Sequence, residues 1–548
     1  MMSFIKQIFY PLLLIISCLI VYSTTFNFLI DSGGDSAQYV LLAESISKGI
    51  GYKTINSPGV PLHTQYPFLF PLLLSPIVFF LGYNLLSMHL LMIILGTLSI
   101  FVIYLIFKEY FCKDISLLLS ILIAFTPPFY FLVNGILSEI PYLLFSSLTI
   151  YMHLKFQKIS ILRSSNFEIL FMSIAILAAF FTRTIGISLF MAYIAFLIQK
   201  GELSIKELSV NPVKYLILAL LALLIILWLF RGYMQGPGII YLNQFFFIDP
   251  YNPLEGSVKA IHLYKRLINN ISYYFNLIPY LYAPWISFLK HEHQKIVGFI
   301  VLFFPLIGFL KNLFFRRTFV EFYFLFYLFF IYIWFWNGSR FLVPIFPLFV
   351  LYFLIGLKLV LNFLNKYIML NPVIAKNIFS ILLITTILFP NINTVSKIIN
   401  NNKTLLSAHF KKNSQENKFK MLFQKIGHLP EGSVIGDNSR WKEYISLSYY
   451  LQTVSKENGD KTVLCRKPRL TSLISGMKSV GLNHLPLIKN SKELLIFIEE
   501  FNIGYIIVDN LFIETTKYLI PLINTVKEKF VILKDEGNNN FLLATKDS

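Results

Sequence analysis

Two carboxylates stand close together at the start of the first hydrophilic stretch, in the segment Asp31-Ser-Gly-Gly-Asp35. A long apolar segment, residues 8–30, ends directly before them, so both side chains are expected where a membrane span meets water. A carboxylate at that boundary can remove a proton from an incoming hydroxyl and so act as a general base. Gly33 and Gly34 allow the backbone to approach a ligand closely. This segment is therefore a candidate catalytic loop.

Asp35 is the stronger of the two candidates. The segment Asp35–Gln38 resembles a helix capping box, and a helix N-terminus stabilises a carboxylate in its charged form. Capping alone would explain Asp35 without any catalytic role, and a solvated loop position would explain Asp31. Residues 36–48 predict a short helix that lies in the membrane interface with its apolar stripe down, and the segment Gly49–Gly51 ends it.

The elements that must position this loop are membrane helices. Of the 548 residues 56% are hydrophobic and only 14% are charged, whereas an ordinary soluble domain carries about 25% charged residues. The apolar runs are long enough to cross a bilayer, and only helices and closed barrels satisfy their backbone in lipid. The formal net charge of +19 comes in large part from short loops between these runs. It favours anionic lipid headgroups as partners and argues against nucleic acid.

Lysines and arginines in the short loops predict about eleven spans, with the N-terminus in the cytoplasm and the C-terminus outside. Two large external loops are expected, residues 31–66 and 232–290, and the second contains a predicted amphipathic helix over Ser257–Tyr274. Between residues 67 and 154, the sides of the membrane that the charged loops indicate do not agree with the number of apolar segments, and the two differ by one span. One apolar segment there is therefore expected to be short, re-entrant or kinked, and the Pro127-Pro128 pair is one candidate site.

After the last predicted span, residues 377–391, the composition changes to one rich in Lys, Asn, Ser and Glu. The pattern predicts a transmembrane module over residues 1–391 and a small extracytoplasmic α/β domain over residues 392–548. A turn at residues 536–540 is expected to join the last two strands as a hairpin. The predicted strands are 433–435, 462–464, 505–508, 530–533 and 541–544, and helices are predicted at 492–501 and 514–528.

Several segments, taken together, resemble the GT-C superfamily of membrane glycosyltransferases. The nearest groups are the protein O-mannosyltransferases and the aminoarabinose transferases, which are glycosyltransferase family 39-like. The order and spacing fit over roughly residues 1–350. One departure is Ser36, where the family often has a second acidic residue. The motifs that carry the resemblance are Gly34-Asp35-Ser-Ala-Gln-Tyr39, Gly51-Tyr52, Tyr66–Pro71, Asn134–Pro141, Phe181–Gly186 and Ser339–Pro347.

The resemblance implies an inverting glycosyltransferase with a GT-C fold. Asp35 matches the family's first-loop base and would deprotonate an acceptor hydroxyl or amine, which then attacks the anomeric carbon of a polyprenyl-phosphate sugar. Arg183 and Arg340, both expected at external span ends, are candidates for stabilising the leaving lipid phosphate. Anchoring in the headgroup region would explain them equally well. Further candidates for supporting or substrate-binding roles are Asp31, Tyr39, Glu139 and, more weakly, Arg266 with Lys265.

The expected partners are membrane lipid, the polyprenyl-phosphate sugar donor and a glycan, lipid or protein acceptor. The expected location is the bacterial plasma membrane. No cofactor is otherwise implied, and a divalent metal is left open through Glu139. Two alternatives stay open: a polyprenyl-linked glycan ligase or polymerase, and a transporter or flippase of lipid-linked glycans. Transport would predict ionisable residues inside spans, whereas most charges of this chain stand at span ends.

Overall fold

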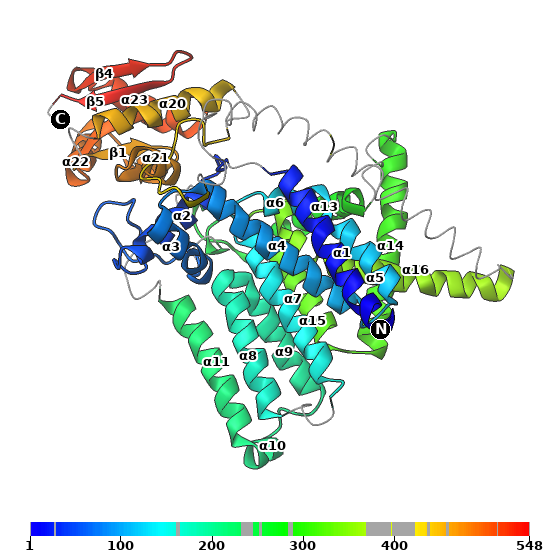
Figure 1. Ribbon diagram of the computed structural model, residues 1–548. Helices are drawn as coiled ribbons and strands as arrows, with labels where there is room; N and C mark the ends of the chain where they lie inside the picture. Colours follow the sequence, from blue (N-terminus) through cyan, green and yellow to red (C-terminus); the bar gives the residue numbers. More distant parts are fainter. Residues whose placement is uncertain are drawn as a thin grey trace.

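The computed structural model of the chain shows a bundle of apolar helices with a small α/β domain at one end (Figure 1). The N-terminal end of the first helix lies away from that domain, and the C-terminus lies within it. The described residues are 2–26, 29–159, 165–231, 245–250, 255–282, 286, 289–368, 396, 422–435, 439–455, 460–511 and 513–546.

The bundle contains most of the apolar segments that the sequence predicts as spans. In chain order its described helices are α1 (Met2–Thr24), α3 (Leu69–Leu81), α4 (Leu85–Phe107), α5 (Lys113–Ala124), α6 (Pro127–Val133), α7 (Glu139–Phe156), α8 (Asn166–Thr182), α9 (Ile187–Gln199), α10 (Ile205–Val210), α11 (Pro212–Phe230), α13 (Ala260–Tyr282), α14 (His291–Phe315), α15 (Phe319–Ile333) and α16 (Phe346–Ile368).

Within the described part of the chain, four helical segments are long and apolar enough to cross a membrane, namely α4, α11, α14 and the segment Ser339–Phe363 that contains most of α16. Five shorter apolar helices accompany them, including α3, α8 and α15. The predicted class, a protein with many apolar helices, is confirmed. The number of about eleven spans stays a prediction, and the predicted span 377–391 lies outside the described residues.

The irregular span predicted between residues 67 and 154 is found at Pro127-Pro128. Helices α5 and α6 meet there at an angle of 67° and together have the length and composition of one broken span. Thr126 adopts an extended conformation with ψ 134°, because a residue before proline is disfavoured in the helical region. Pro127 then begins α6, where its missing N–H costs no hydrogen bond. The prediction of a kink at this site is confirmed.

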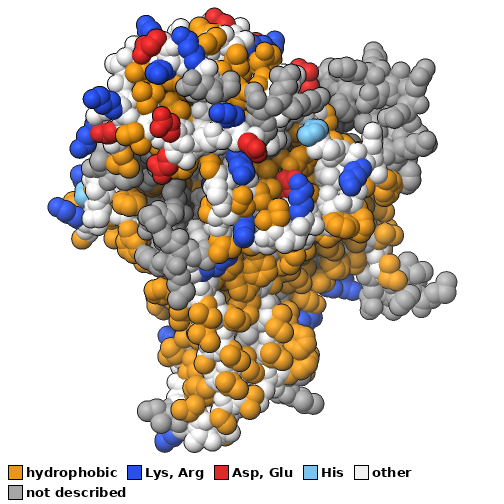
Figure 2. Space-filling view, turned by 90° about the vertical axis from the view of Figure 1, so that its left-hand side faces the viewer, with side chains coloured by type: hydrophobic (Ala, Val, Ile, Leu, Met, Phe, Trp, Pro, Cys, Tyr) orange, Lys and Arg blue, Asp and Glu red, His pale blue; other side chains and the backbone are white. Residues whose placement is uncertain are grey.

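A broad apolar surface covers the lower part of the molecule, and charged side chains gather at the opposite end (Figure 2). On α11 the exposed side chains of Leu216, Leu220, Leu223 and Leu227 recur at the spacing of one helical face. Such a continuous apolar face is stable in lipid and unfavourable in water. We infer that this surface contacts the membrane.

The C-terminal domain is built on a five-stranded sheet with the order β2-β1-β3-β5-β4. The first three of these strands are parallel, and β5 pairs antiparallel with both β3 and β4. Buried side chains alternate between the two faces: one face packs against α20 and the other against α22 and α23. The elements are α20 (Ser439–Val454), β1 (Thr462–Cys465), α21 (Pro468–Ser475), β2 (Ser479–Gly481), α22 (Ser491–Glu500), β3 (Ile503–Val508), α23 (Ile520–Asn524), β4 (Phe530–Asp535) and β5 (Phe541–Thr545).

Most of the elements predicted for this domain are confirmed. Four of the five predicted strands correspond to β1, β3, β4 and β5, and β4 and β5 pair across the predicted turn. The strand predicted at 433–435 is wrong, because Val434 makes only a single bridge to Ile30. The helix predicted over 514–528 is confirmed over most of its length, because α-helical residues 513–514, a π-helical segment over Thr515–Leu519 and α23 follow one another without a break. The predicted domain boundary at residue 391 lies outside the described residues and stays a prediction.

Helix α2 (Asp35–Ser47) forms where the sequence predicts a helix, and it ends at Lys48 before Gly49, which has a positive φ of 69°. Its position in the membrane interface stays a prediction, but its apolar stripe does not face lipid. Side chains around the whole helix, including Ala37, Leu41 and Leu42, are buried. The physical reason is that α21 of the C-terminal domain packs over α2, on the side away from the bundle (Figure 1).

Helices α14 and α16 approach each other closely at two glycines. A Cβ atom on Gly308 would lie 1.9 Å from the carbonyl oxygen of Tyr352, and one on Gly356 would lie 1.9 Å from that of Phe304. Both contacts are with backbone, which cannot move aside as a side chain can. Small residues allow membrane helices to pack backbone against backbone in this way.

Gly308→Ala is therefore expected to force the two helices apart and to lower the free energy of unfolding by about 2 kcal/mol. Thermal unfolding of the detergent-purified protein measures this loss. Gly298→Ala, on the same helix, is the matched control. Its Cβ would come no closer than 3.3 Å to a side-chain carbon of Pro279, so its effect should be smaller. Equal effects of the two substitutions would contradict the close helix packing.

Candidate active site

The first residue of α2 is Asp35, and its carboxylate does not cap the helix. Gly34 is the N-cap residue, with φ 96°, and no side chain caps the helix. The predicted capping box is therefore wrong, because the left-handed turn at Gly34 places Asp35 one position too far along the chain. The carboxylate is free to make other contacts.

Three side chains from distant parts of the chain hold this carboxylate. The Tyr66 hydroxyl donates to Oδ1 at 2.8 Å, and Arg340 donates from NH1 to Oδ2 at 3.0 Å. Arg469, from the C-terminal domain, places its NH1 3.5 Å from Oδ1. The Asp35 side chain is still 26% exposed, so it is both held in place and accessible.

The charge state of Asp35 follows from these neighbours. Burial by itself would raise its pKa, but the positive charges of Arg340 and Arg469 and the hydrogen bond from Tyr66 outweigh burial and hold the pKa below the usual range. The carboxylate is therefore ionised at neutral pH and can accept a proton.

Asp31 has a different environment. Its carboxylate accepts the backbone N–H of Gly33 at 2.8 Å and the hydroxyl of Ser36. A Cβ at Gly33 would lie 2.7 Å from an Asp31 oxygen, so a larger residue there would displace the Asp31 carboxylate. Burial, with the negative charge of Asp35, raises the pKa of Asp31. Both of its oxygens are used to shape the turn that leads into α2, which fits a supporting position.

Glu139, the first residue of α7, lies between two arginines. Its side chain is 1% exposed, and its Oε1 lies 2.7 Å from NH1 of Arg183 and 3.6 Å from Nε of Arg340. Because Arg340 also binds Asp35, the four side chains form a continuous row of alternating charges. This row is called the charge row below. Glu139 fixes the direction of both guanidinium groups.

Tyr39 reaches the charge row through Ser138. Its hydroxyl lies 2.8 Å from Ser138 Oγ, which also accepts a hydrogen bond from Arg183 at 3.1 Å. The structure thus brings together most of the predicted site residues, from four separate parts of the chain. They are Asp35, Tyr39, Glu139, Arg183 and Arg340, with Asp31 in the adjoining turn.

The two arginines are placed by short turns at the helix ends. Arg183 is extended at the end of α8, and a tight turn follows in which a Cβ on Gly186 would lie 2.6 Å from the backbone of Phe180. Arg340 lies in a 3₁₀ turn before α16. The two guanidinium groups lie 5.8 Å and 5.1 Å from the ring centre of Phe341, within the range of a cation–π contact.

The structure does not bring Arg266 to the charge row. Its guanidinium donates to the backbone carbonyls of Phe245 and Ile248, at 2.9 Å and 3.2 Å, and also to that of Phe247. It also lies 5.0 Å from the ring centre of Phe335. These contacts connect residues 245–248 to α13. Helix α13 corresponds to the helix predicted over Ser257–Tyr274, but it begins at Ala260 and continues to Tyr282.

The sequence identifies Tyr66 only as the first residue of the motif Tyr66–Pro71, and the structure adds its contact with Asp35. Its backbone N–H donates to His63 Nε2 at 2.9 Å, and His63 Nδ1 lies 3.1 Å from the Thr54 hydroxyl. Burial, with the positive charges of Arg469 and Arg231, lowers the pKa of His63, so the ring stays neutral. A chain of hydrogen bonds therefore fixes Tyr66.

The acidic side chains of the site do not fit a divalent cation. In the described residues no three His, Cys, Asp or Glu side chains come together at a distance suited to a shared metal ion. Asp35 and Glu139, the acidic groups of the charge row, are both engaged by arginine. We therefore derive no step through a metal.

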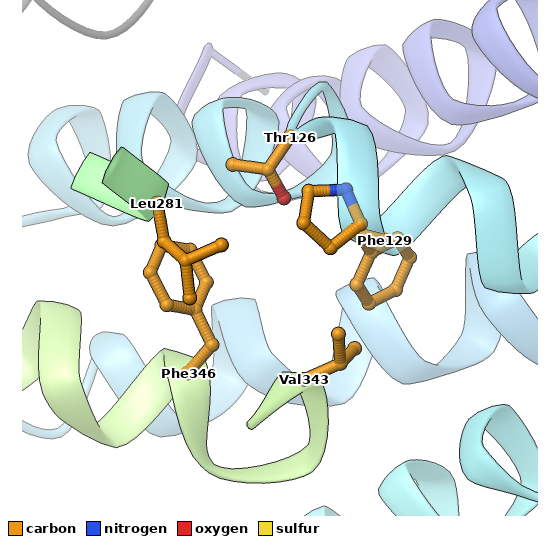
Figure 3. A pocket seen from close by; sticks show the side chains of 6 residues that line it. Thr126, Phe129, Leu281, Val343 and Phe346 are labelled. Atoms are coloured by element: carbon orange, nitrogen blue, oxygen red, sulfur yellow. The ribbon is translucent and has the colours of Figure 1, made fainter. Parts of the chain in front are cut away.

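A small apolar cavity between α6, α13 and the segment leading into α16 is a poor candidate site (Figure 3). Its space suffices for about one water molecule and its walls offer almost no polar partner. The side chains that line it are those of Thr126, Pro128, Phe129, Leu281, Val343 and Phe346.

Solved structures of GT-C glycosyltransferases share this fold. An oligosaccharyltransferase of Archaeoglobus fulgidus tethered with an acceptor peptide matches with a TM-score of 0.55 at 14% identity, over 99% of this chain and 75% of that chain. The archaeal oligosaccharyltransferase AglB of Archaeoglobus fulgidus, with an inhibitory peptide and a dolichol-phosphate, has a TM-score of 0.53 at 14% identity, over 92% and 69%. ArnT of Cupriavidus metallidurans bound to undecaprenyl phosphate has a TM-score of 0.55 at 10% identity, over 97% of each chain.

The sequence gives a second, independent link to the same class. Residues 65–230 match the family model of dolichyl-phosphate-mannose-protein mannosyltransferases. No curated protein matches the chain in sequence. The resemblance to the GT-C superfamily, and to its protein O-mannosyltransferase and aminoarabinose transferase groups, is thereby confirmed.

Glu139→Gln removes the negative charge that Arg183 and Arg340 share. Breaking a buried ion pair in this way is expected to cost about 3 kcal/mol of the free energy of unfolding, because a buried guanidinium loses its counter-charge. The double variant with Arg183→Gln should lose less than the sum of the two single losses. Denaturation of the purified variants measures this. Lys48→Gln, whose side chain is 61% exposed, is the control and should cost less than about 1 kcal/mol.

Proposed function

We propose that this protein is an inverting glycosyltransferase. It moves a sugar from a polyprenyl-phosphate-linked donor to a glycan, lipid or protein acceptor at the external face of the membrane, with Asp35 as the general base. The observation that carries the proposal is an ionised, partly exposed carboxylate directly joined to a row of arginines at the end of an apolar helix bundle.

In this reaction Asp35 accepts the proton of the acceptor hydroxyl or amine. Its two oxygens each retain a lone pair beside the bonds to Tyr66 and Arg340. The acceptor atom then forms a bond to the anomeric carbon from the face opposite the phosphate, and the bond between that carbon and the phosphate oxygen breaks. The electron pair stays on the phosphate, which leaves as an anion.

Arginines of the charge row stabilise that developing charge. Arg340 is 41% exposed and can turn part of its guanidinium to a bound phosphate, while Arg183 is 15% exposed and held by Glu139. Guanidinium groups that are already oriented cost little reorganisation when the charge appears. Arg340 is therefore the main phosphate contact, and Arg183 supports the site from behind Glu139.

The lipid nature of the donor is supported by the position of the site. A donor with a long isoprenoid tail stays in the bilayer, since each buried CH₂ contributes about 0.8 kcal/mol. Its phosphate then lies at the membrane boundary, where helix α2 begins. Two solved structures with the same fold are complexes with such lipids, one with a dolichol-phosphate and one with undecaprenyl phosphate. We expect the protein in a bacterial plasma membrane with the C-terminal domain outside.

Asp35→Asn is expected to lower sugar transfer by about 10²–10⁴-fold, because the amide cannot accept the proton. The measurement is mass spectrometry of cell-surface glycans and lipids from a strain that carries the variant in place of the wild-type gene. Comparison with a deletion strain also identifies the acceptor. Asp31→Asn is the matched control and should retain more transfer. Wild-type transfer by Asp35→Asn at normal expression would rule out Asp35 as the base.

Chelation with EDTA is expected to leave transfer unchanged, and this experiment tests the divalent metal that the sequence leaves open. The reason is that Arg183, Arg340 and Arg469 already supply positive charge around Asp35 and Glu139. Transfer in membranes washed with EDTA, and after addition of Mg²⁺ or Mn²⁺, measures this. Loss of transfer that either ion restores would show that a metal takes part.

A further inference from the structure

The C-terminal domain reaches the candidate catalytic carboxylate through the loop that follows β1. This loop contains Lys467 and leads into α21, whose second residue is Arg469. It lies at the carboxyl end of β1, which is the central one of the three parallel strands. Functional residues of α/β domains commonly lie at this end of the sheet. In this protein that end of the sheet faces the first external loop rather than solvent.

Arg469 makes several contacts with that loop. Its NH1 donates to the Tyr66 hydroxyl at 2.7 Å and lies 3.5 Å from Asp35 Oδ1, and its NH2 donates to the side chain of Gln65. The guanidinium also lies 5.2 Å from the ring centre of Tyr66. The Tyr66 hydroxyl therefore accepts a hydrogen bond from Arg469 and donates one to Asp35.

Helix α21 is firmly docked. Its Leu470, Leu473 and Ile474 are buried in the same core as the membrane helices. The backbone N–H of Ser479, just after α21, donates to the carbonyl of Asn56 at 2.8 Å. The Cβ of Arg469 lies about 4.0 Å from the Cβ position of Gly34. Arg469 is thus held in place by the packing of the domain.

We propose that Arg469 is a positioning residue for Asp35, so that the C-terminal domain supplies part of the active site. The proposal rests on the proposed function of Asp35 as the base. Arg469 and Tyr66 hold Oδ1, while Arg340 holds Oδ2 from the other side. Because these contacts act on different oxygens, they fix the plane of the carboxylate. They thereby also fix the direction of the lone pairs that receive the proton.

A second consequence concerns the charge of Asp35. The charged and titratable groups that face it are Arg340 before α16, Lys467 and Arg469 of the C-terminal domain, Tyr66 and Asp31 of the first loop, and Tyr39 of its own helix. Arg469 is one of two cations in direct contact with it. Loss of that charge raises the pKa of Asp35, so the base becomes protonated at a higher pH.

The test compares Arg469→Gln, Arg469→Lys and Tyr66→Phe in the full-length protein, with transfer measured from pH 4 to 9. Arg469→Gln should lower kcat roughly tenfold and move the acid limb of kcat/KM up by about one pH unit, with the KM for the donor little changed. Arg469→Lys should keep the acid limb near its wild-type position, because the charge is retained, and still lower kcat. Lys478→Gln, at an exposed position of the same domain, should change neither.

A purely structural role of Arg469 would lower the yield of folded protein without moving the acid limb. Wild-type kcat and an unshifted limb in Arg469→Gln, with Asp35→Asn inactive, would overturn the proposal. If Arg469→Gln does not fold, Tyr66→Phe decides, because the Tyr66 hydroxyl accepts the hydrogen bond from Arg469 and donates the one to Asp35 Oδ1. Unchanged kcat and limb in Tyr66→Phe would then overturn it. Wild-type transfer by Asp35→Asn would instead remove the proposed function on which the inference rests.

Discussion

A carboxylate that is mostly shielded from water needs nearby positive charge to remain ionised, and much of the site follows from that need at Asp35. Arg340 and Arg469 meet it from opposite sides. Each of these arginines is in turn partly buried and needs acceptors of its own. Arg340 finds one in Glu139, and Arg469 finds them in Tyr66 and Gln65. Charge compensation thus extends from one carboxylate through the whole site.

This arrangement explains why the site joins segments that are far apart in the chain. Compensation requires side chains at fixed distances, and those side chains come from the ends of α8, the start of α7, the turn before α16 and the start of α21. Helix ends suit the purpose because they lie at the boundary of the bundle, where a guanidinium keeps some contact with water. A bundle that held the same charges within its spans would bear a far larger cost of burial.

Local patterns in the sequence predict the class and the first loop, and the resemblance to the GT-C superfamily adds most of the residues that form the charge row. Apolar length identifies helices, and polar residues at their ends identify the membrane boundary. The prediction fails at Asp35 in one respect: the pattern Asp35–Gln38 is that of a capping box, but Gly34 takes the N-cap place. The stripe of apolar residues on α2 also does not reveal that α21 covers the other side of this helix.

Arg469 lies beyond any local pattern. It is separated from Tyr66 by 403 positions, and no helix is predicted from the sequence at Pro468–Ser475, where α21 forms. The contact exists because the parallel strands β1, β2 and β3 put their connecting loops at one edge, and the packing of α21 against α2 turns that edge toward the first loop. The domain that the sequence marks as separate by its composition is thus joined to the bundle at the candidate base. Because its leucines share the core of the bundle, the placement of Arg469 is tied to the folding of both parts.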